Sequence, residues 1–155
     1  MAQSVTDQQQ SKSGLIQADH VRQMVDDLFT SMFDTSVELV DGPFDAHAPD
    51  SFQAAIRING DWKAELRVIA SRGLAESIAQ SMFDADVSEL SEEEILDALG
   101  EIANVIGGNV KGIVDQECSL SLPCVGKIDD TARRGDVSQI YRCFEDDLRV
   151  SLIED

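Results

Sequence analysis

The residues best suited to binding or catalysis recur at helical spacing in one segment of the chain: Asp97, Glu101, Asn104, Gly108 and Lys111. If this segment is α-helical, at about 100° per residue, the five positions share a face about 80° wide. Two carboxylates, an amide, a bare backbone position and an ammonium would then form one exposed line. An amide both donates and accepts hydrogen bonds and can hold a water molecule in a fixed direction, whereas a carboxylate can pair with a cation.

The simplest alternative is an ordinary solvated helix face, which most exposed polar residues form. Two features argue against it. Asn104 is a poor helix-interior residue with no evident capping role, and the Gly107-Gly108 pair costs about 1 kcal/mol per glycine relative to alanine inside a helix. Glycines at this place indicate the close approach of a packed element or a docked partner, although a helix that ends at Gly107 is a competing explanation.

The helix itself is predicted from its start and from its apolar stripe. The pattern Ser91-x-x-Glu94 is typical of a capping box at a helix N-terminus. Six aliphatic residues then recur at helical spacing: Ile95, Leu99, Ile102, Ile106, Val110 and Ile113. Because this stripe lies opposite the polar line, we expect the helix to bury one side and expose the other.

Two more elements are predicted from local signals. Alternating apolar residues flank Asn59-Gly60, which predicts a β-hairpin with a type I′ turn at these two residues. Trp62, beside this turn, is expected to be a core residue or an interface anchor. Ser71 is expected to cap a second helix that ends near Phe83-Asp84.

The remaining segments complete an α+β fold. Apolar periodicity predicts a first helix at 21–33 and short strands at 37–39, 118–122, 139–144 and 148–153. The last two strands are expected to be joined by Glu145–Asp147. Hairpins grouped in this way are typical of a largely antiparallel β-sheet with three helices packed on it.

Composition limits the class of protein. The 155 residues favour one domain, expected at 15–155, after a disordered polar tail at 1–14 that lacks the features of a signal peptide. A net charge of −18 argues against binding nucleic acid or an anionic membrane. No stretch has the 18 or so apolar residues of a membrane span, so we expect a cytoplasmic protein. The three cysteines show no metal-ligand spacing, and we expect no bound metal.

The pattern Asp97-x-x-x-Glu101-x-x-Asn104, within DALGEIANVIGGNVKG, resembles the signature of the CheC/CheX/FliY group of chemotaxis phosphatases. The order of predicted elements is also similar from about residue 16 to the end. Two-site CheC-type members carry the signature twice. The first predicted helix here, MVDDLFTSMF, has no second copy, so the chain resembles the single-site CheX type.

This resemblance implies a phosphatase that hydrolyses the aspartyl phosphate of a phosphorylated CheY-like response regulator. Asn104 would orient the attacking water, and Glu101 would pair with a cationic residue of the regulator. Asp97, Gly108 and Lys111 are the candidate docking residues. The enzyme would need no cofactor of its own, because the regulator would supply Mg²⁺.

The resemblance leaves one alternative open. A non-catalytic CheC-like adaptor, or a flagellar-switch-like module, could bind a response regulator without dephosphorylating it. The presence of both Glu101 and Asn104 favours the enzyme. Relatives of the CheX type also imply a homodimer, whereas the identity of the regulator and its signalling pathway stay open.

Overall fold

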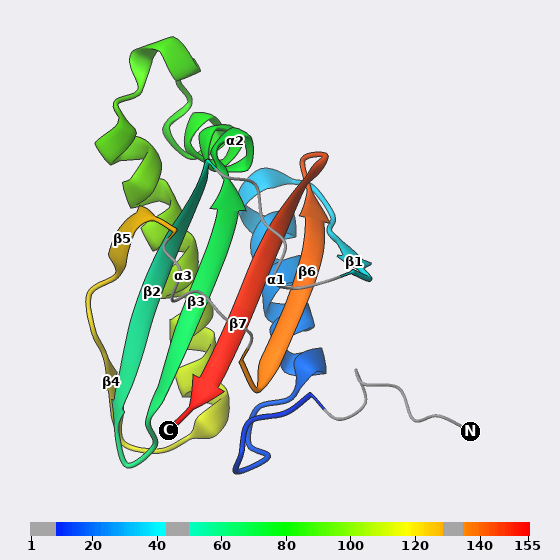
Figure 1. The fold of residues 1–155 in the computed structure, drawn as a ribbon, viewed down its shortest axis with the longest axis vertical. Coiled ribbons are helices and arrows are strands. Elements are labelled where there is room, and N and C mark those ends of the chain that lie inside the picture. Colours follow the sequence, from blue (N-terminus) through cyan, green and yellow to red (C-terminus); the bar gives the residue numbers. More distant parts are fainter. Residues whose placement is uncertain (1–8, 43–49, 129–134) are drawn as a thin grey trace.

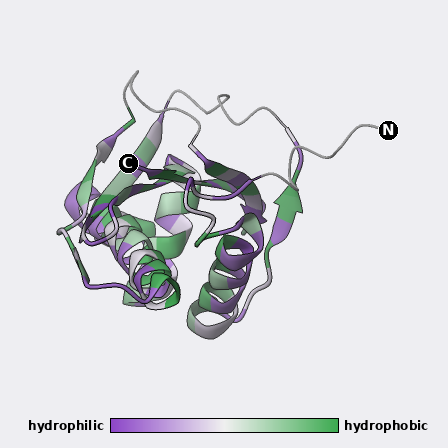
Figure 2. Ribbon diagram, turned by 90° about the horizontal axis from the view of Figure 1, so that it is seen from below, coloured by the Kyte–Doolittle hydropathy of each residue, from purple (hydrophilic) through white to green (hydrophobic). Residues whose placement is uncertain are grey.

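The computed structural model describes residues 9–42, 50–128 and 135–155. Three α-helices pack on one face of a seven-stranded antiparallel sheet, which confirms the predicted α+β class (Figures 1 and 2). The helices are α1 (Ala18–Phe33), α2 (Arg72–Phe83) and α3 (Glu92–Val114), with a short 3₁₀ helix at Val87–Glu89. The strands are β1 (Glu38–Val40), β2 (Ser51–Gly60), β3 (Ala64–Ser71), β4 (Cys118–Leu120), β5 (Cys124–Lys127), β6 (Val137–Cys143) and β7 (Asp146–Glu154).

The sheet is ordered β1-β6-β7-β3-β2-β4, and β5 also pairs with β2. Strands β4 and β5 therefore share one edge, and β1 forms the opposite edge (Figure 1). Alternate residues of β2, such as Ile56 and Ile58, are fully buried in the core that the sheet forms with the helices. The intervening residues, such as Gln53 and Arg57, are only partly buried. This alternation is the pattern expected of a sheet covered by helices on one face.

The hairpin predicted around Asn59-Gly60 is present, but the predicted turn is wrong. Both residues still belong to β2, and the last pair of the β2–β3 ladder is Ile58 with Ala64. Asn59 and Gly60 pair instead with β4. Gly60 has φ 140°, and a Cβ there would lie only 2.2 Å from the carbonyl oxygen of Glu117. The glycine is thus required by the close approach of another chain segment and not by a two-residue turn.

The tight turn with positive φ lies elsewhere, between β6 and β7. Phe144 and Glu145 have φ 50° and 69° and join the two strands directly, so the turn is shorter than the predicted Glu145–Asp147 connection. Positive φ is unfavourable for a bulky residue. The Phe144 ring packs against Phe29 and Phe33 of α1, with ring centroids 6.1 and 5.7 Å apart, and this contact favours the turn.

The start of the chain is hydrogen-bonded to the rest of the structure from Gln9 onward. The first eight residues of the expected tail lie outside the described residues. The Gln9 side chain accepts a hydrogen bond from the backbone N–H of Ser138 at 2.8 Å. The Ser13 hydroxyl accepts one from the indole N–H of Trp62 at 3.3 Å, and Trp62 is buried as a core residue. The described part of the expected tail therefore packs on the domain. Among the described helices, none has the length and hydrophobicity that crossing a membrane requires.

Candidate functional site

The helix α3 begins at the capping box that the sequence predicts. The Ser91 hydroxyl accepts from the backbone N–H of Glu94 at 3.1 Å, and the Glu94 carboxylate accepts from the backbone N–H of Ser91 at 3.0 Å. The adjacent Glu92 carboxylate pairs with Arg72 at 2.6 Å, and Arg72 also pairs with Asp50 at 2.9 Å. These contacts tie the first turn of α3 to the starts of α2 and β2.

The buried side of α3 carries the predicted aliphatic stripe, with one exception at its end. Residues from Ile95 to Val110 in the stripe are buried. Ile113 is 42% exposed, because the last turn presents Val114 to the core in its place. The helix runs without interruption to Val114, so the alternative that it ends at Gly107 is wrong.

Gly107 and Gly108 have different surroundings. A Cβ on Gly107 would lie 3.5 Å from Cγ2 of Ile56 in β2, so this glycine faces the sheet. A Cβ on Gly108 would meet nothing within 4 Å. Packing against β2 therefore explains the glycine at position 107. Gly108 instead leaves bare backbone on the exposed side of the helix.

The exposed side of α3 carries the polar line. Asp97, Glu101, Asn104 and Gly108 are exposed, and Lys111 is partly buried in the last turn. Within the described part of the chain, the side chains of Asp97, Glu101 and Asn104 make no hydrogen bond or ion pair. Two carboxylates and an amide thus point into solvent with their hydrogen-bonding capacity unused. Such an arrangement is suited to contacting a partner that brings a cation and a bound water.

Sequence reasoning missed a contact on the flank of this line. A Cβ on Gly100 would lie 3.1 Å from Cγ1 of Val125 and 3.3 Å from Cβ of Pro123. Gly100, next to Glu101, therefore allows the β4–β5 connection to pack tightly against α3. The only sequence signal was one more glycine inside a strong helix, which does not reveal what approaches it.

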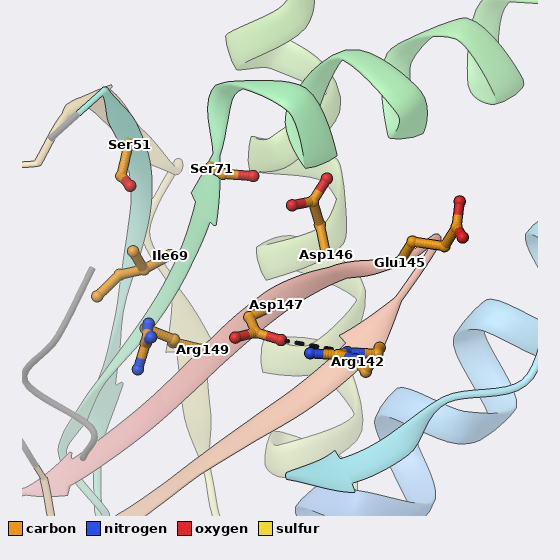
Figure 3. Close-up of a pocket in the computed structure, with 8 residues that line it drawn as sticks. All are labelled: Ser51, Ile69, Ser71, Arg142, Glu145, Asp146, Asp147 and Arg149. Carbon is orange, nitrogen blue, oxygen red and sulfur yellow. Dashed lines mark ion pairs between the residues drawn. The ribbon is translucent and has the colours of Figure 1, made fainter. Parts of the chain in front are cut away.

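A separate hollow of about 210 Å³ lies where β2, β3, β6 and β7 meet near the β6–β7 turn (Figure 3). Arg142 and Asp147 form an ion pair across it at 3.7 Å. Burial lowers the pKa of Arg149, which also lines it. None of its lining residues belongs to α3, so the hollow is not part of the polar line. Within the described ranges, no three His, Cys, Asp or Glu side chains are grouped to hold a metal ion.

Comparison with known families decides what kind of protein carries this helix. Residues 52–143, which include all of α3, match the family described as Chemotaxis phosphatase CheX. The chain belongs to the CheX family. No curated protein matches this CheX-family chain by sequence.

Solved structures with the same fold include CheX proteins and a chain of a FliM-SpeE complex. The chemotaxis protein CheX from Vibrio vulnificus is 18% identical, with a TM-score of 0.71 over 88% of this chain and 95% of that one. A chain of the CheX-CheY-BeF3-Mg²⁺ complex from Borrelia burgdorferi is 10% identical, with a TM-score of 0.67 over 88% and 96%. A chain of the FliM-SpeE complex from H. pylori is 8% identical, with a TM-score of 0.63 over 88% and 82%. At these identities the likeness shows the fold alone.

Proposed function

We propose that this CheX-family protein hydrolyses the aspartyl phosphate of a CheY-like response regulator. The observation that carries the proposal is the solvent-facing line of Asp97, Glu101 and Asn104 on α3, inside the segment that matches the CheX family. The likeness to a chain of a CheX-CheY complex supports a CheY-like regulator as the partner.

Asn104 orients the attacking water. In this reaction the water oxygen forms a bond to phosphorus, the bond between phosphorus and the aspartyl oxygen breaks, and inorganic phosphate and a free carboxylate result. Positioning supplies most of the catalysis in phosphoryl transfer. The Asn104 carboxamide oxygen accepts a hydrogen bond from the water and directs its lone pair toward phosphorus, without the strong basicity of a carboxylate. The regulator supplies Mg²⁺, and this chain needs no cofactor of its own.

Glu101 aligns the two proteins. It lies one turn before Asn104 and has no ion-pair partner among the described residues. It pairs with a cationic side chain of the regulator, expected to be its active-site lysine, and so places Asn104 against the phosphoryl group. Asp97 extends the acidic line by another turn, Gly108 lets the partner approach the helix backbone, and Lys111 contributes a positive charge at the end of the line.

The test measures phosphate release from a CheY-like regulator of the same organism, phosphorylated with acetyl phosphate. We expect Asn104→Ala to lower the catalysed rate by about 100-fold, because a lost positioning group costs roughly this factor, while complex affinity is retained. Asn109→Ala is the matched control, since Asn109 is an exposed amide of the same helix outside the polar line. Full turnover by Asn104→Ala would overturn the assigned mechanism.

Glu101→Ala tests the alignment step. We expect it to weaken complex formation and to lower the rate as well, because the regulator's cation loses its partner. An unaltered affinity would count against the ion pair. Glu93→Ala, an exposed carboxylate in the first turn of the same helix, is the control.

A non-catalytic adaptor is the second candidate function, favoured by the likeness to a chain of the FliM-SpeE complex. An adaptor would bind the regulator and leave the rate of phosphate release unchanged. A homodimer, which the family resemblance implies, also stays a prediction, and sedimentation would test it.

A further inference from the structure

One apolar side chain stands out on the surface. Leu122 is 88% exposed, whereas the other exposed large apolar side chains of the described residues are between 36% and 43% exposed. Single exposed leucines are common on protein surfaces. The position and the rigidity of this one are what make it informative.

The segment that carries Leu122 runs along α3. At one end, Cδ2 of Leu120 would lie 3.7 Å from a Cβ on Gly107. At the other end, Cβ of Pro123 would lie 3.3 Å from a Cβ on Gly100. Two glycines, seven residues apart on the helix, thus mark where the β4–β5 connection begins and ends its contact with α3. Figure 1 shows β4 and β5 at the edge of the sheet beside β2, with α3 behind the sheet.

Leu122 lies between these two contacts in the chain, and Asn104 lies midway between the two glycines on the helix. Seven helical residues span about 10 Å. Leu122 is therefore presented beside the stretch of α3 between Gly100 and Gly107, which carries Glu101 and Asn104, on the flank of the polar line.

The backbone on both sides of Leu122 is held in place. The backbone N–H of Ser121 donates to the carbonyl of Arg57 at 2.9 Å, and the Ser121 hydroxyl accepts from the N–H of Arg57 at 2.9 Å. Pro123 follows, and a residue before proline is restricted to extended conformations. A side chain presented on a fixed backbone loses little conformational entropy when a partner covers it.

We propose that Leu122 is an apolar anchor that enters a depression on the surface of the CheY-like regulator when α3 docks. This inference rests on the proposed function. A stable interface covers roughly 800 Å² on each partner, so a regulator that reaches Asn104 also covers an exposed side chain beside the same stretch of the helix. Leu122 then supplies a dry apolar contact beside the polar line, next to the ion pair that Glu101 makes with the regulator.

The test compares Leu122→Ser with the wild-type protein. Binding to the regulator and phosphate release are both measured. We expect Leu122→Ser to raise the dissociation constant and KM by about tenfold or more, as loss of an interface anchor does, with kcat at saturation nearly unchanged. Leu122→Met should restore the affinity. The midpoint of thermal unfolding should not change, because the side chain is exposed in the free protein.

Leu39→Ser is the matched control, because Leu39 lies in β1 at the opposite edge of the sheet. If Leu122→Ser binds the regulator as tightly as the wild-type protein does, and phosphatase activity depends on Asn104, the anchor would be overturned and the proposed function would stand. If Leu122→Ser binds the regulator more weakly and the wild-type protein releases no phosphate, the anchor would be supported and the phosphatase activity overturned. A change in sedimentation without a change in regulator binding would also overturn the anchor, since it would assign Leu122 to contact between copies of this chain.

Discussion

At the scale of single residues, Gly108 is the position where helix stability and the proposed docking make opposite demands. It lies inside α3 with nothing within 4 Å of where a Cβ would be. Gly112, one turn further on, is equally open. We expect Gly108→Ala and Gly112→Ala each to stabilise the protein by about 0.5–1 kcal/mol, because alanine is the better helix former. Urea unfolding measures this gain.

The same Gly108→Ala variant should weaken regulator binding by about tenfold, since forcing a methyl group into a packed contact costs roughly 1–3 kcal/mol. Gly112→Ala, at the far end of the helix from Asn104, should bind normally. A Gly108→Ala variant that is both more stable and fully competent in binding would show that no partner packs at this point.

The glycines of α3 also show what single residues reveal before a structure is known. A Gly107-Gly108 pair in a strong helix indicates that something approaches the backbone. It does not indicate that Gly107 meets Ile56 in the core while Gly108 faces solvent. The orientation of each glycine follows from helix geometry, but the identity of its neighbour depends on where β2 and β4 pack.

At the scale of elements, all three α-helices end in the same way. Asp34, Asp84 and Asp115 follow α1, α2 and α3 in left-handed conformations, with φ 51°, 49° and 56°. Glycine and asparagine adopt this conformation more easily, and a negative charge at a helix C-terminus interacts unfavourably with the helix dipole. Each cap is therefore stabilised less than it could be.

We expect Asp84→Asn to raise the free energy of unfolding by about 0.3–1 kcal/mol, because it removes the charge and keeps a residue that tolerates positive φ. Asp84→Gly should add the gain from backbone freedom. Urea unfolding at low and high salt measures both. The gain of Asp84→Asn should shrink at high salt, and a gain independent of salt would contradict the dipole explanation.

A repeated tetrapeptide shows which features of a helix C-terminus are set by the local sequence. Ser-Met-Phe-Asp occurs at 31–34 and at 81–84, and the aspartate ends a helix both times. Yet Phe33 packs against Phe29 with ring centroids 5.2 Å apart, whereas Phe83 is 43% exposed. The same residues thus set the same helix end, and the surroundings decide whether the aromatic ring packs against the core or is exposed.

At the scale of the whole molecule, two titratable groups in β6 link stability to alkaline pH. Burial raises the pKa of the Cys143 thiol to about 12 and also raises the pKa of the Tyr141 phenol. In the unfolded chain the thiol loses its proton near pH 9. Above that pH the folded state holds a proton that the unfolded state has released. The free energy of unfolding should therefore fall by up to about 1.4 kcal/mol per pH unit for the thiol.

Urea unfolding at pH 7.5, 9 and 10 tests this dependence. Below pH 9 both states hold the Cys143 proton, so the thiol contributes no slope. Cys143→Ala should be less stable than wild type at pH 7.5 through lost packing, but its stability should fall less steeply between pH 9 and 10. Parallel pH profiles for the two proteins would show that the thiol does not contribute.

The acidic excess of the chain also has a definite distribution in the fold. With 12 basic and 30 acidic residues, carboxylates far outnumber basic side chains. The described ion pairs engage Arg57, Arg67, Arg72 and Arg142, none of which lies on α3. On the proposed function, the carboxylates of the polar line pair with a cation of the regulator, although the net charge of the chain also repels a phosphorylated partner. The helix face, more than the net charge, is therefore expected to select the partner.

Sequence alone determined the properties that depend on neighbours along the chain. The capping box at Ser91 and the helical spacing that puts Asp97, Glu101 and Asn104 on one face follow from local geometry. The same three residues also carry the resemblance to the family signature. Periodicity repeats every few residues, so it can be inferred without knowing what packs nearby.

Only the tertiary structure decided what lies beside that face. Asn59-Gly60, which the sequence predicts as a turn, lies in a strand because contacts between distant segments pair it with β4. They also placed the β4–β5 connection, which carries Leu122, against α3 at Gly100 and Gly107. Such contacts depend on sheet order and on the packing of the whole core, and no local pattern in the sequence specifies them.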